Sequence, residues 1–484
     1  MEKSLTKNAL LNIAGNGLNI LFPLISFPYI ARVLGPESIG EVNYILSVMT
    51  YFTLFSSFGI PIYATRELAK LKNNKQSFEN LANEMFLISL LTSLVTYAIF
   101  IGLLLAIPQF KENALFFLAA SFLIIFNTIG LEWLYQALEE FSFITYRSMI
   151  IKSISLVLLF VFVQSEDDKM LYLVITVFGI VGSHIFNLIY SKRFITIRIS
   201  RMVFKNISKH LKPLLVLFFS SLVASIYLGM DILLLGSITN DYTAVGYYYA
   251  AIKINRIAIT ILASVSLVVI PRMSFLVQSG DQLKYKELLQ KMFDINILFA
   301  LPLVCYLLMF SEEIILILSG PLYTNAIITM QLITPIILTA AVTNVLYNQV
   351  LIPNNKENVI IIASLAGVVT CFLFNYLLVP HYAQNGTAVA TLLTEIVVMA
   401  VELGFVYPLV KEHLFSASQK NSFIAVILMA LSLLLVKYYV DHLIFTVILS
   451  VLFSFISYFG ALLLLKDKNL YYFLNKFKYS LSLK

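Results

Sequence analysis

The sequence is poor in the residues on which catalytic, metal and disulfide sites depend. Charged residues make up 12% of the 484 residues, and there are 2 cysteines, 1 tryptophan and 5 scattered histidines. Cys305 and Cys371 both fall within apolar runs, so we expect neither a disulfide framework nor a metal cluster. The chain has no G-x-x-x-x-G-K-[ST] loop and no H-E-x-x-H motif. We therefore predict a protein that is not an enzyme and has no resident cofactor or metal.

Long apolar runs take the place of those residues. Hydrophobic residues make up 60% of the chain, the mean hydropathy is +0.89, and the charged residues gather between the runs. A helix that crosses a bilayer needs about 20 mostly apolar residues and satisfies its own backbone polar groups. We predict an all-α polytopic membrane protein with about 14 transmembrane helices. The expected spans are 8–34, 39–62, 83–107, 114–136, 143–164, 170–190, 211–238, 243–271, 289–318, 324–352, 359–379, 385–408, 421–440 and 443–465.

The basic residues predict the orientation. With a cytoplasmic N-terminus, 25 of the 33 Lys and Arg fall in inner segments, and only Arg32, Lys111, Lys169 and Lys437 fall at the outer side. This asymmetry satisfies the positive-inside rule and places both termini in the cytoplasm. Contact with anionic lipid accounts for the net charge of +7, so no nucleic-acid partner is needed. The Lys-, Ile- and Asn-rich composition is typical of an AT-rich bacterial genome, so the expected location is a bacterial cell membrane.

A basic linker divides the chain after six spans. The predicted parts are a six-helix lobe at 1–190, a cytoplasmic linker at 191–210, a second six-helix lobe at 211–410, and two extra helices with a tail at 411–484. The order Leu-Gly, Gly, Pro occurs at 34–35, 40 and 61 and again at 235–236, 246 and 271, which favours a parallel duplication. A substrate site between lobes of one chain predicts a functional monomer. Gly and Pro that merely punctuate turns would give the same order.

Among the prolines inside predicted spans, three are candidate bends. Pro23 and Pro28 fall in the first span and Pro335 in the tenth. A proline in a helix removes one backbone hydrogen bond and bends the helix. We expect these positions to act either as hinges or as static kinks.

Five stretches carry a resemblance to a known family. They are Phe27 to Pro36 (FPYIARVLGP), Phe58 to Glu67 (FGIPIYATRE), Glu132 to Glu139 (EWLYQALE), Asp231 to Gly236 (DILLLG), and Asn344 to Pro353 (NVLYNQVLIP). In this order the chain resembles the polysaccharide flippases of the multidrug/oligosaccharidyl-lipid/polysaccharide exporter superfamily over residues 1–408. One departure is Tyr382-Ala383-Gln384, which stands where relatives often carry a Gly before the outer turn.

The resemblance implies both an architecture and a function. It implies two six-helix bundles forming a V around a polar cavity. It also implies export of an undecaprenyl-pyrophosphate-linked oligosaccharide from the inner to the outer leaflet by alternating access, for capsule or other surface polysaccharide. A polysaccharide polymerase and glycosyltransferases would then be partners in the membrane.

Cations inside spans are candidate substrate ligands. A charge at the bilayer centre costs about 2.5–3.5 kcal/mol on insertion scales, so each should face protein or water. The candidates for a cationic cavity that would hold pyrophosphate are Lys253, Arg256, Lys152, Arg147 and Arg32. Structural ion pairing is the competing role for each of them.

Acids accompany these cations. The candidates are Glu395, Asp231, Glu132 and Glu402. They would serve as charge partners, for example Glu395 with Lys253 or Asp231 with Arg256, or as sites that couple transport to a Na⁺ or H⁺ gradient.

Amides in the spans are candidate sugar contacts. They are Asn16, Asn19, Asn127, Asn344 and Asn348. Asparagine in a spanning helix also acts as interhelical packing glue, and this alternative stays open.

Two other functions remain compatible with the sequence. One is a multidrug antiporter of the same superfamily, although Lys253, Arg256 and Lys152 would repel organic cations. The other is a membrane enzyme, such as a polysaccharide polymerase or acyltransferase, although the outer loops expected here are short. A lipid II flippase is a near relative of the predicted exporter and also stays open.

Overall fold

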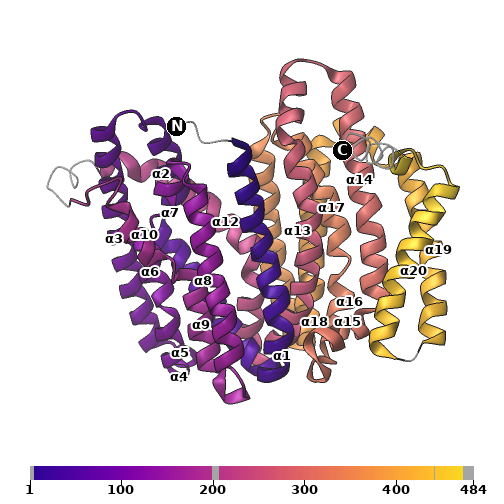
Figure 1. Cartoon of the computed structure of the whole chain (residues 1–484), viewed down its shortest axis with the longest axis horizontal. Coiled ribbons are helices and arrows are strands. Elements are labelled where there is room, and N and C mark those ends of the chain that lie inside the picture. Colours follow the sequence, from indigo (N-terminus) through magenta and orange to yellow (C-terminus); the bar gives the residue numbers. More distant parts are fainter. Residues whose placement is uncertain (1–4, 199–206, 441, 472–484) are drawn as a thin grey trace. The chain divides into compact units, whose positions relative to one another are not determined.

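A computed structural model describes residues 5–198, 207–440 and 442–471 (Figure 1). Side chains are described from Phe22 onward, except that of Leu228. All regular structure in these residues is helical, and 12 segments are long and apolar enough to cross a membrane. The predicted all-α polytopic membrane fold is confirmed.

Two of the 12 segments are far longer than a bilayer needs. Phe22–Lys70 has 49 residues and Glu357–His413 has 57, against the ~20 that one crossing requires. Gly35 (φ 70°, ψ 176°) breaks the first segment and Ala383 (φ 44°, ψ −124°) the second. The first also turns at Phe58 and Gly59, between α1 and α2 and close to its end. Counting the arms on each side separately gives 14 segments, in agreement with the expected number of about 14.

The described residues group into two compact units, Met1–Gly236 and Ser237–Lys484. The helices of the first unit are α1 Leu5–Ser57, α2 Ile60–Lys70, α3 Lys75–Ala106, α4 Pro108–Glu112, α5 Ala114–Ala120, α6 Phe122–Gly130, α7 Glu132–Ala137, α8 Phe141–Phe162, the 3₁₀ turn η1 Glu166–Asp168, α9 Lys169–Val181, α10 His184–Ser191 and α12 Ser208–Thr239.

The second unit begins just before α13. Its helices are α13 Tyr242–Gln278, α14 Gln282–Met309, α15 Ser311–Ser319, the 3₁₀ turn η2 Pro321–Tyr323, α16 Ala326–Ile333, α17 Ile336–Val345, the π-helical segment η3 Leu346–Leu351, α18 Glu357–Val410, the 3₁₀ turn η4 Lys411–His413, α19 Ala417–Tyr439 and α20 Leu443–Leu464. The last two, yellow in Figure 1, pack on each other, and both contact α14.

Helix α12 packs with the first unit. His210 and Leu214 are buried against α2 and α3, and the Phe218 ring stacks on Phe58 at 5.4 Å between centroids. The sequence division into lobes places this helix in the second lobe, whereas its contacts here lie in Met1–Gly236. The predicted linker 191–210 includes residues 199–206, which lie outside the described residues.

The helices extend beyond several predicted spans because hydropathy marks only the part of a helix that suits lipid. Helix α3 begins at Lys75, eight residues before the expected start of its span, and Asn74 caps it by accepting a hydrogen bond from the Ser77 amide. Pro335 separates α16 from α17, as expected for the tenth span. Pro23 and Pro28 lie within continuous helix, and the break in α1 falls at Gly35 instead.

Candidate functional site

Two helix breaks in the first unit bring polar residues into the interior of the spans. Helix α6 ends at Gly130 and α7 begins at Glu132, with Leu131 between them at φ 49°. Helix α9 ends at Val181 and α10 begins at His184. A broken helix leaves backbone carbonyls without their usual partners, and in a membrane the protein itself must supply donors for them.

Side chains of α10 supply these donors. Asn187 Nδ2 donates to the Gly130 carbonyl, and His184 Nδ1 donates to the Phe126 carbonyl at 2.8 Å. Tyr135 in turn donates to the Asn187 carbonyl. A Cβ at Gly130 would lie 2.8 Å from His184 Nδ1, so this close approach requires glycine. The two breaks are therefore joined as one hydrogen-bonded unit.

A cation and an anion meet beside the breaks. Arg147 of α8 donates from Nη2 to Glu132 Oε1 at 2.7 Å, and His184 Nε2 lies 3.9 Å from the same oxygen. The Arg147 side chain is 4% exposed and that of Glu132 is 46% exposed. The Arg147 guanidinium also lies over the Phe143 ring, 5.6 Å from its centroid. Among the residues whose side chains are described, its buried Nε and Nη1 have no hydrogen-bond partner, so the group keeps donors of the kind that bind phosphate oxygens.

A small polar cavity adjoins this ion pair. Its volume is about 100 Å³, and its wall includes Glu132, His184, Gln136, Asn127 and Ser57. Asn127 Nδ2 donates to Ser57 Oγ at 2.8 Å and to Ser56 Oγ at 3.2 Å. The predicted candidates Glu132 and Asn127 thus line one pocket of the first unit, and Arg147, which is not part of the lining, joins it through its ion pair with Glu132.

The other candidates of the first unit lie outside this pocket lining. Lys152 is half-buried five residues further along α8, and Asp231 is buried in α12. Arg32 is exposed and donates from Nη1 to the Pro28 carbonyl of its own helix at 2.8 Å. Asn16 and Asn19 fall in α1 outside the residues whose side chains are described.

The second unit holds the other pair of candidate cations on α13. Lys253 Nζ donates to the Tyr249 hydroxyl at 3.1 Å and lies 4.8 Å from the centre of that ring. Lys253 is half-buried and Arg256 is exposed. The two are three residues apart, so they share one face of the helix. Tyr249 therefore positions the ammonium group through both its ring and its hydroxyl.

The acids and amides of the second unit lie on α18 and around η3. Glu395 is half-buried and Glu402 buried, seven residues apart and so on one side of α18. Asn348 is buried in the π-helical segment, and its Nδ2 donates to the Asn344 carbonyl at 3.0 Å. The proposed pairing of Glu395 with Lys253 stays a prediction.

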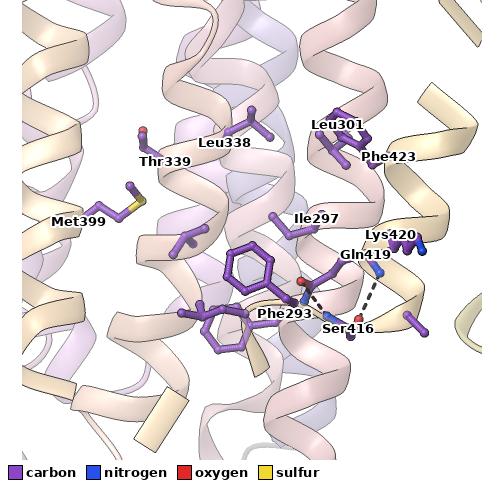
Figure 2. A pocket seen from close by; sticks show the side chains of 14 residues that line it. Phe293, Ile297, Leu301, Leu338, Thr339, Met399, Ser416, Gln419, Lys420 and Phe423 are labelled. Atoms are coloured by element: carbon purple, nitrogen blue, oxygen red, sulfur yellow. Dashed lines mark hydrogen bonds between the residues drawn. The ribbon is translucent and has the colours of Figure 1, made fainter. Parts of the chain in front are cut away.

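A large apolar groove opens beside α19 in the second unit (Figure 2). Its volume is about 740 Å³. Figure 2 shows side chains from four helices around it, such as Ile297 of α14, Leu338 of α17 and Met399 of α18. Ser416, Gln419 and Lys420 supply polar groups where α19 begins, and Thr339 of α17 adds one hydroxyl on another part of the wall. The groove therefore suits a ligand with a long apolar part and a polar end.

Two solved structures share the fold of this chain. A structure of "Lipid II flippase MurJ, inward closed conformation" matches 95% of this chain and 99% of its own with a TM-score of 0.76 at 14% identity. A multidrug resistance MATE family transporter of the MOP superfamily, in an inward-facing conformation, matches 81% of this chain and 94% of its own with a TM-score of 0.62, also at 14% identity. At this identity the likeness shows the fold alone.

The sequence comparisons show the family. The family model described as "Polysaccharide biosynthesis protein" matches residues 5–277, so the chain belongs to that family. A protein of Escherichia coli (strain K12) named "Putative O-antigen transporter" is 25% identical over 361 residues, which cover 73% of this chain and 85% of that protein. A protein of the same name from Shigella dysenteriae is 26% identical, over 73% of this chain and 88% of its own. The predicted superfamily and the prediction of a non-enzymatic protein are confirmed.

Sequence reasoning overlooked His184 and the role of Tyr249. A signal for His184 was present, because a titratable residue within a predicted span is a functional candidate by default. Tyr249 is not among the candidates that the sequence indicates. Its contact with Lys253, one helical turn away, follows from the i,i+4 spacing.

Proposed function

We propose that the protein exports lipid-linked oligosaccharide repeat units across the cytoplasmic membrane of a bacterium. The substrate would be joined to undecaprenyl pyrophosphate and would move from the inner to the outer leaflet by alternating access. The product would serve capsule or another surface polysaccharide. Membership of the polysaccharide biosynthesis family and the two similar transporters support this assignment.

The structural observation that carries the proposal is the Arg147 site. A guanidinium almost fully buried among membrane spans, with Nε and Nη1 left without partners, is costly unless an anion uses it. Pyrophosphate offers several acceptor oxygens of the right charge. Lys253 and Arg256 would supply further positive charge in the second unit.

The groove beside α19 supports the lipid part of the substrate. A mostly apolar volume of about 740 Å³ with a lysine and other polar groups where α19 begins fits a segment of a polyprenyl chain next to a charged head group. An organic cation of the kind that multidrug antiporters carry would be repelled by Arg147, Lys253 and Arg256 rather than held by them. Coupling to a Na⁺ or H⁺ gradient, a partner polymerase, and a functional monomer with both termini in the cytoplasm complete the proposal.

The deciding experiment is a deletion strain analysed by mass spectrometry of its undecaprenyl-linked intermediates. Accumulation of one complete lipid-linked repeat unit, with loss of surface polymer, is expected. Intact surface polymer without accumulation, together with new sensitivity to cationic dyes, would favour the multidrug antiporter instead.

A paired set of variants tests the cationic site of the second unit. Lys253→Ala with Arg256→Ala should fail to restore export in the deletion strain while inserting normally, because it removes both cations of α13. The control, Lys284→Ala with Lys286→Ala, removes the same charge from exposed positions on α14 and should restore export. Full export by the first pair would contradict a role of these cations in substrate binding.

A further inference from the structure

The hydrogen bond at Phe126 fixes which nitrogen of His184 carries the proton. Nδ1 lies 2.8 Å from the Phe126 carbonyl oxygen, which can only accept, so Nδ1 is the donor. In the neutral ring Nε2 then carries a lone pair. A second proton can bind only at Nε2, and that atom faces Glu132 Oε1 at 3.9 Å. Protonation of His184 would therefore place a new positive charge directly beside the carboxylate.

The carboxylate oxygen that faces His184 is already engaged. Glu132 Oε1 accepts from Arg147 Nη2 at 2.7 Å. The charged groups that act on the imidazole are Glu132 from α7 and Arg147 from α8, and Lys152 acts on Glu132 from one helical turn further along α8. One oxygen thus stands between a permanent cation and a titratable one.

The geometry allows the carboxylate to change partner with little movement. Closing the 3.9 Å separation to a charge-assisted hydrogen bond requires a shift of about 1 Å. Glu132 is the most exposed of the three side chains, at 46%, against 11% for His184 and 4% for Arg147. The adjoining polar cavity of about 100 Å³ has room for about three water molecules at ~30 Å³ each, which could deliver the proton.

We propose that His184 is a second, proton-dependent partner of Glu132 that controls the availability of Arg147 for phosphate. When a proton from water in the cavity binds Nε2, the imidazole changes from neutral to +1 and Glu132 moves to it. The Arg147 guanidinium then loses its counter-ion and, with Nε and Nη1 already unpartnered, takes a phosphate group in its place. The proton comes from a hydronium ion, so one O–H bond breaks, one N–H bond forms, a water molecule is left in the cavity and no electrons are transferred. The inference rests on the proposed function, because it regulates the site that would hold pyrophosphate.

The test uses sulfate, whose charge does not change between about pH 5.5 and 8, the range over which histidine titrates. Binding is measured by calorimetry on the full-length protein in nanodiscs. The native protein should bind sulfate about tenfold more tightly at the lower pH. His184→Gln should bind weakly at both pH values, and Glu132→Gln should bind tightly at both, since Arg147 is then always released. Arg147→Gln should bind weakly throughout.

Control variants separate this mechanism from general effects. His381→Gln removes an exposed histidine of α18 and should keep the native pH dependence. His184→Asn provides a second variant in case His184→Gln does not fold, with gel filtration as the check. Native pH dependence in a folded His184 variant, or weak binding by folded Glu132→Gln, would overturn the proposal.

Failure of the inference can be told apart from failure of the proposed function. Sulfate binding reports on the ion pair without any transport, whereas the deletion strain reports on the lipid-linked substrate without reference to His184. The expected sulfate behaviour without accumulation of lipid-linked intermediates would retain the ion-pair exchange and reject the substrate. The reverse result would retain the substrate and reject the exchange.

Discussion

Glu84 of α3 and His210 of α12 form a buried pair in which Glu84 Oε2 lies 2.8 Å from His210 Nε2. The opposite nitrogen of the ring lies 2.8 Å from the hydroxyl of Tyr63 in α2. The side chains of Glu84 and His210 are 4% and 5% exposed, and Lys209 adds a second ion pair to Glu84 at 3.1 Å. The His210 ring thus joins three helices of the first unit, since it bonds to Glu84 of α3 on one side and to Tyr63 of α2 on the other.

Replacing Glu84 with Ala should destabilise the protein strongly. Removal of one partner from a buried charged pair costs about 3–5 kcal/mol, so thermal unfolding in detergent should begin at a clearly lower temperature. Glu67→Ala is the control, because the Glu67 pairs with Arg66 and Lys70 involve more exposed cations and are worth about 1 kcal/mol or less. Equal midpoints for the two variants would show that the Glu84 network contributes little.

Replacing Ala383 with Gly should stabilise the protein. Ala383 has φ 44° and ψ −124°, angles that suit glycine and strain a residue with a Cβ by about 1–3 kcal/mol. Part of that strain should be recovered as a higher unfolding midpoint. Ala366→Gly, in a regular stretch of the same α18, should instead lower stability by about 0.5–1 kcal/mol. A loss of stability in both variants would mean that Ala383 is not strained.

Replacing Gly130 with Ala should disturb the Glu132 site. The new methyl group would lie 2.8 Å from His184 Nδ1 and displace the ring from the Phe126 carbonyl. We expect a loss of about 1–3 kcal/mol for the broken buried hydrogen bond, together with reduced export. Gly102→Ala, in α3 with nothing within 4 Å of the added Cβ, is the matched control and should leave export unchanged. Native export and stability in Gly130→Ala would argue against a fixed position of the His184 ring.

Filling the groove beside α19 should block export without unfolding the protein. Met399 of α18 points into the groove (Figure 2), so Met399→Trp would occupy space that we assign to the lipid chain. Ile396→Trp places the same side chain three residues earlier, at a position that is 39% exposed and outside the groove lining. Only the first variant should accumulate the lipid-linked intermediate. Normal export by Met399→Trp would remove the groove from the transport path.

Hydropathy predicted nearly all of the helices, because long apolar runs have few alternatives in a membrane. It could not predict that α6 ends at Gly130 or that α10 begins at His184, since the apolar pattern continues through both breaks. What decides these breaks is the set of side chains on the neighbouring helix that take up the released carbonyls, Asn187 and His184 in this case. Hydrogen bonds of this kind, between helices that are distant in the sequence, leave no pattern in the residues around the break.

The candidate charges could be found in the sequence because ionisable residues are rare in spans. Their partners were harder to assign, since the chain folds back on itself many times. Glu132 at the start of α7 and Arg147 of α8 are 15 residues apart and form an ion pair. Arg32, by contrast, is exposed and donates a hydrogen bond to a carbonyl of its own helix. The place of a charged residue within its span indicates how deep in the membrane it lies. Which neighbouring helix its side chain faces depends on how the helices pack.

The last two helices are secured by a single carboxylate at one end. Asp294 of α14 is buried and accepts hydrogen bonds from Gln290, Ser416, Gln419 and Asn469, at 2.9, 2.6, 3.0 and 3.0 Å. Gln290 belongs to α14 itself. Ser416 directly precedes α19, Gln419 lies in its first turn, and Asn469 follows α20. The hairpin should therefore move together with α14 as one rigid body when the protein changes conformation. A spin label on the exposed face of the hairpin would then report the movement of α14 without contacting the substrate.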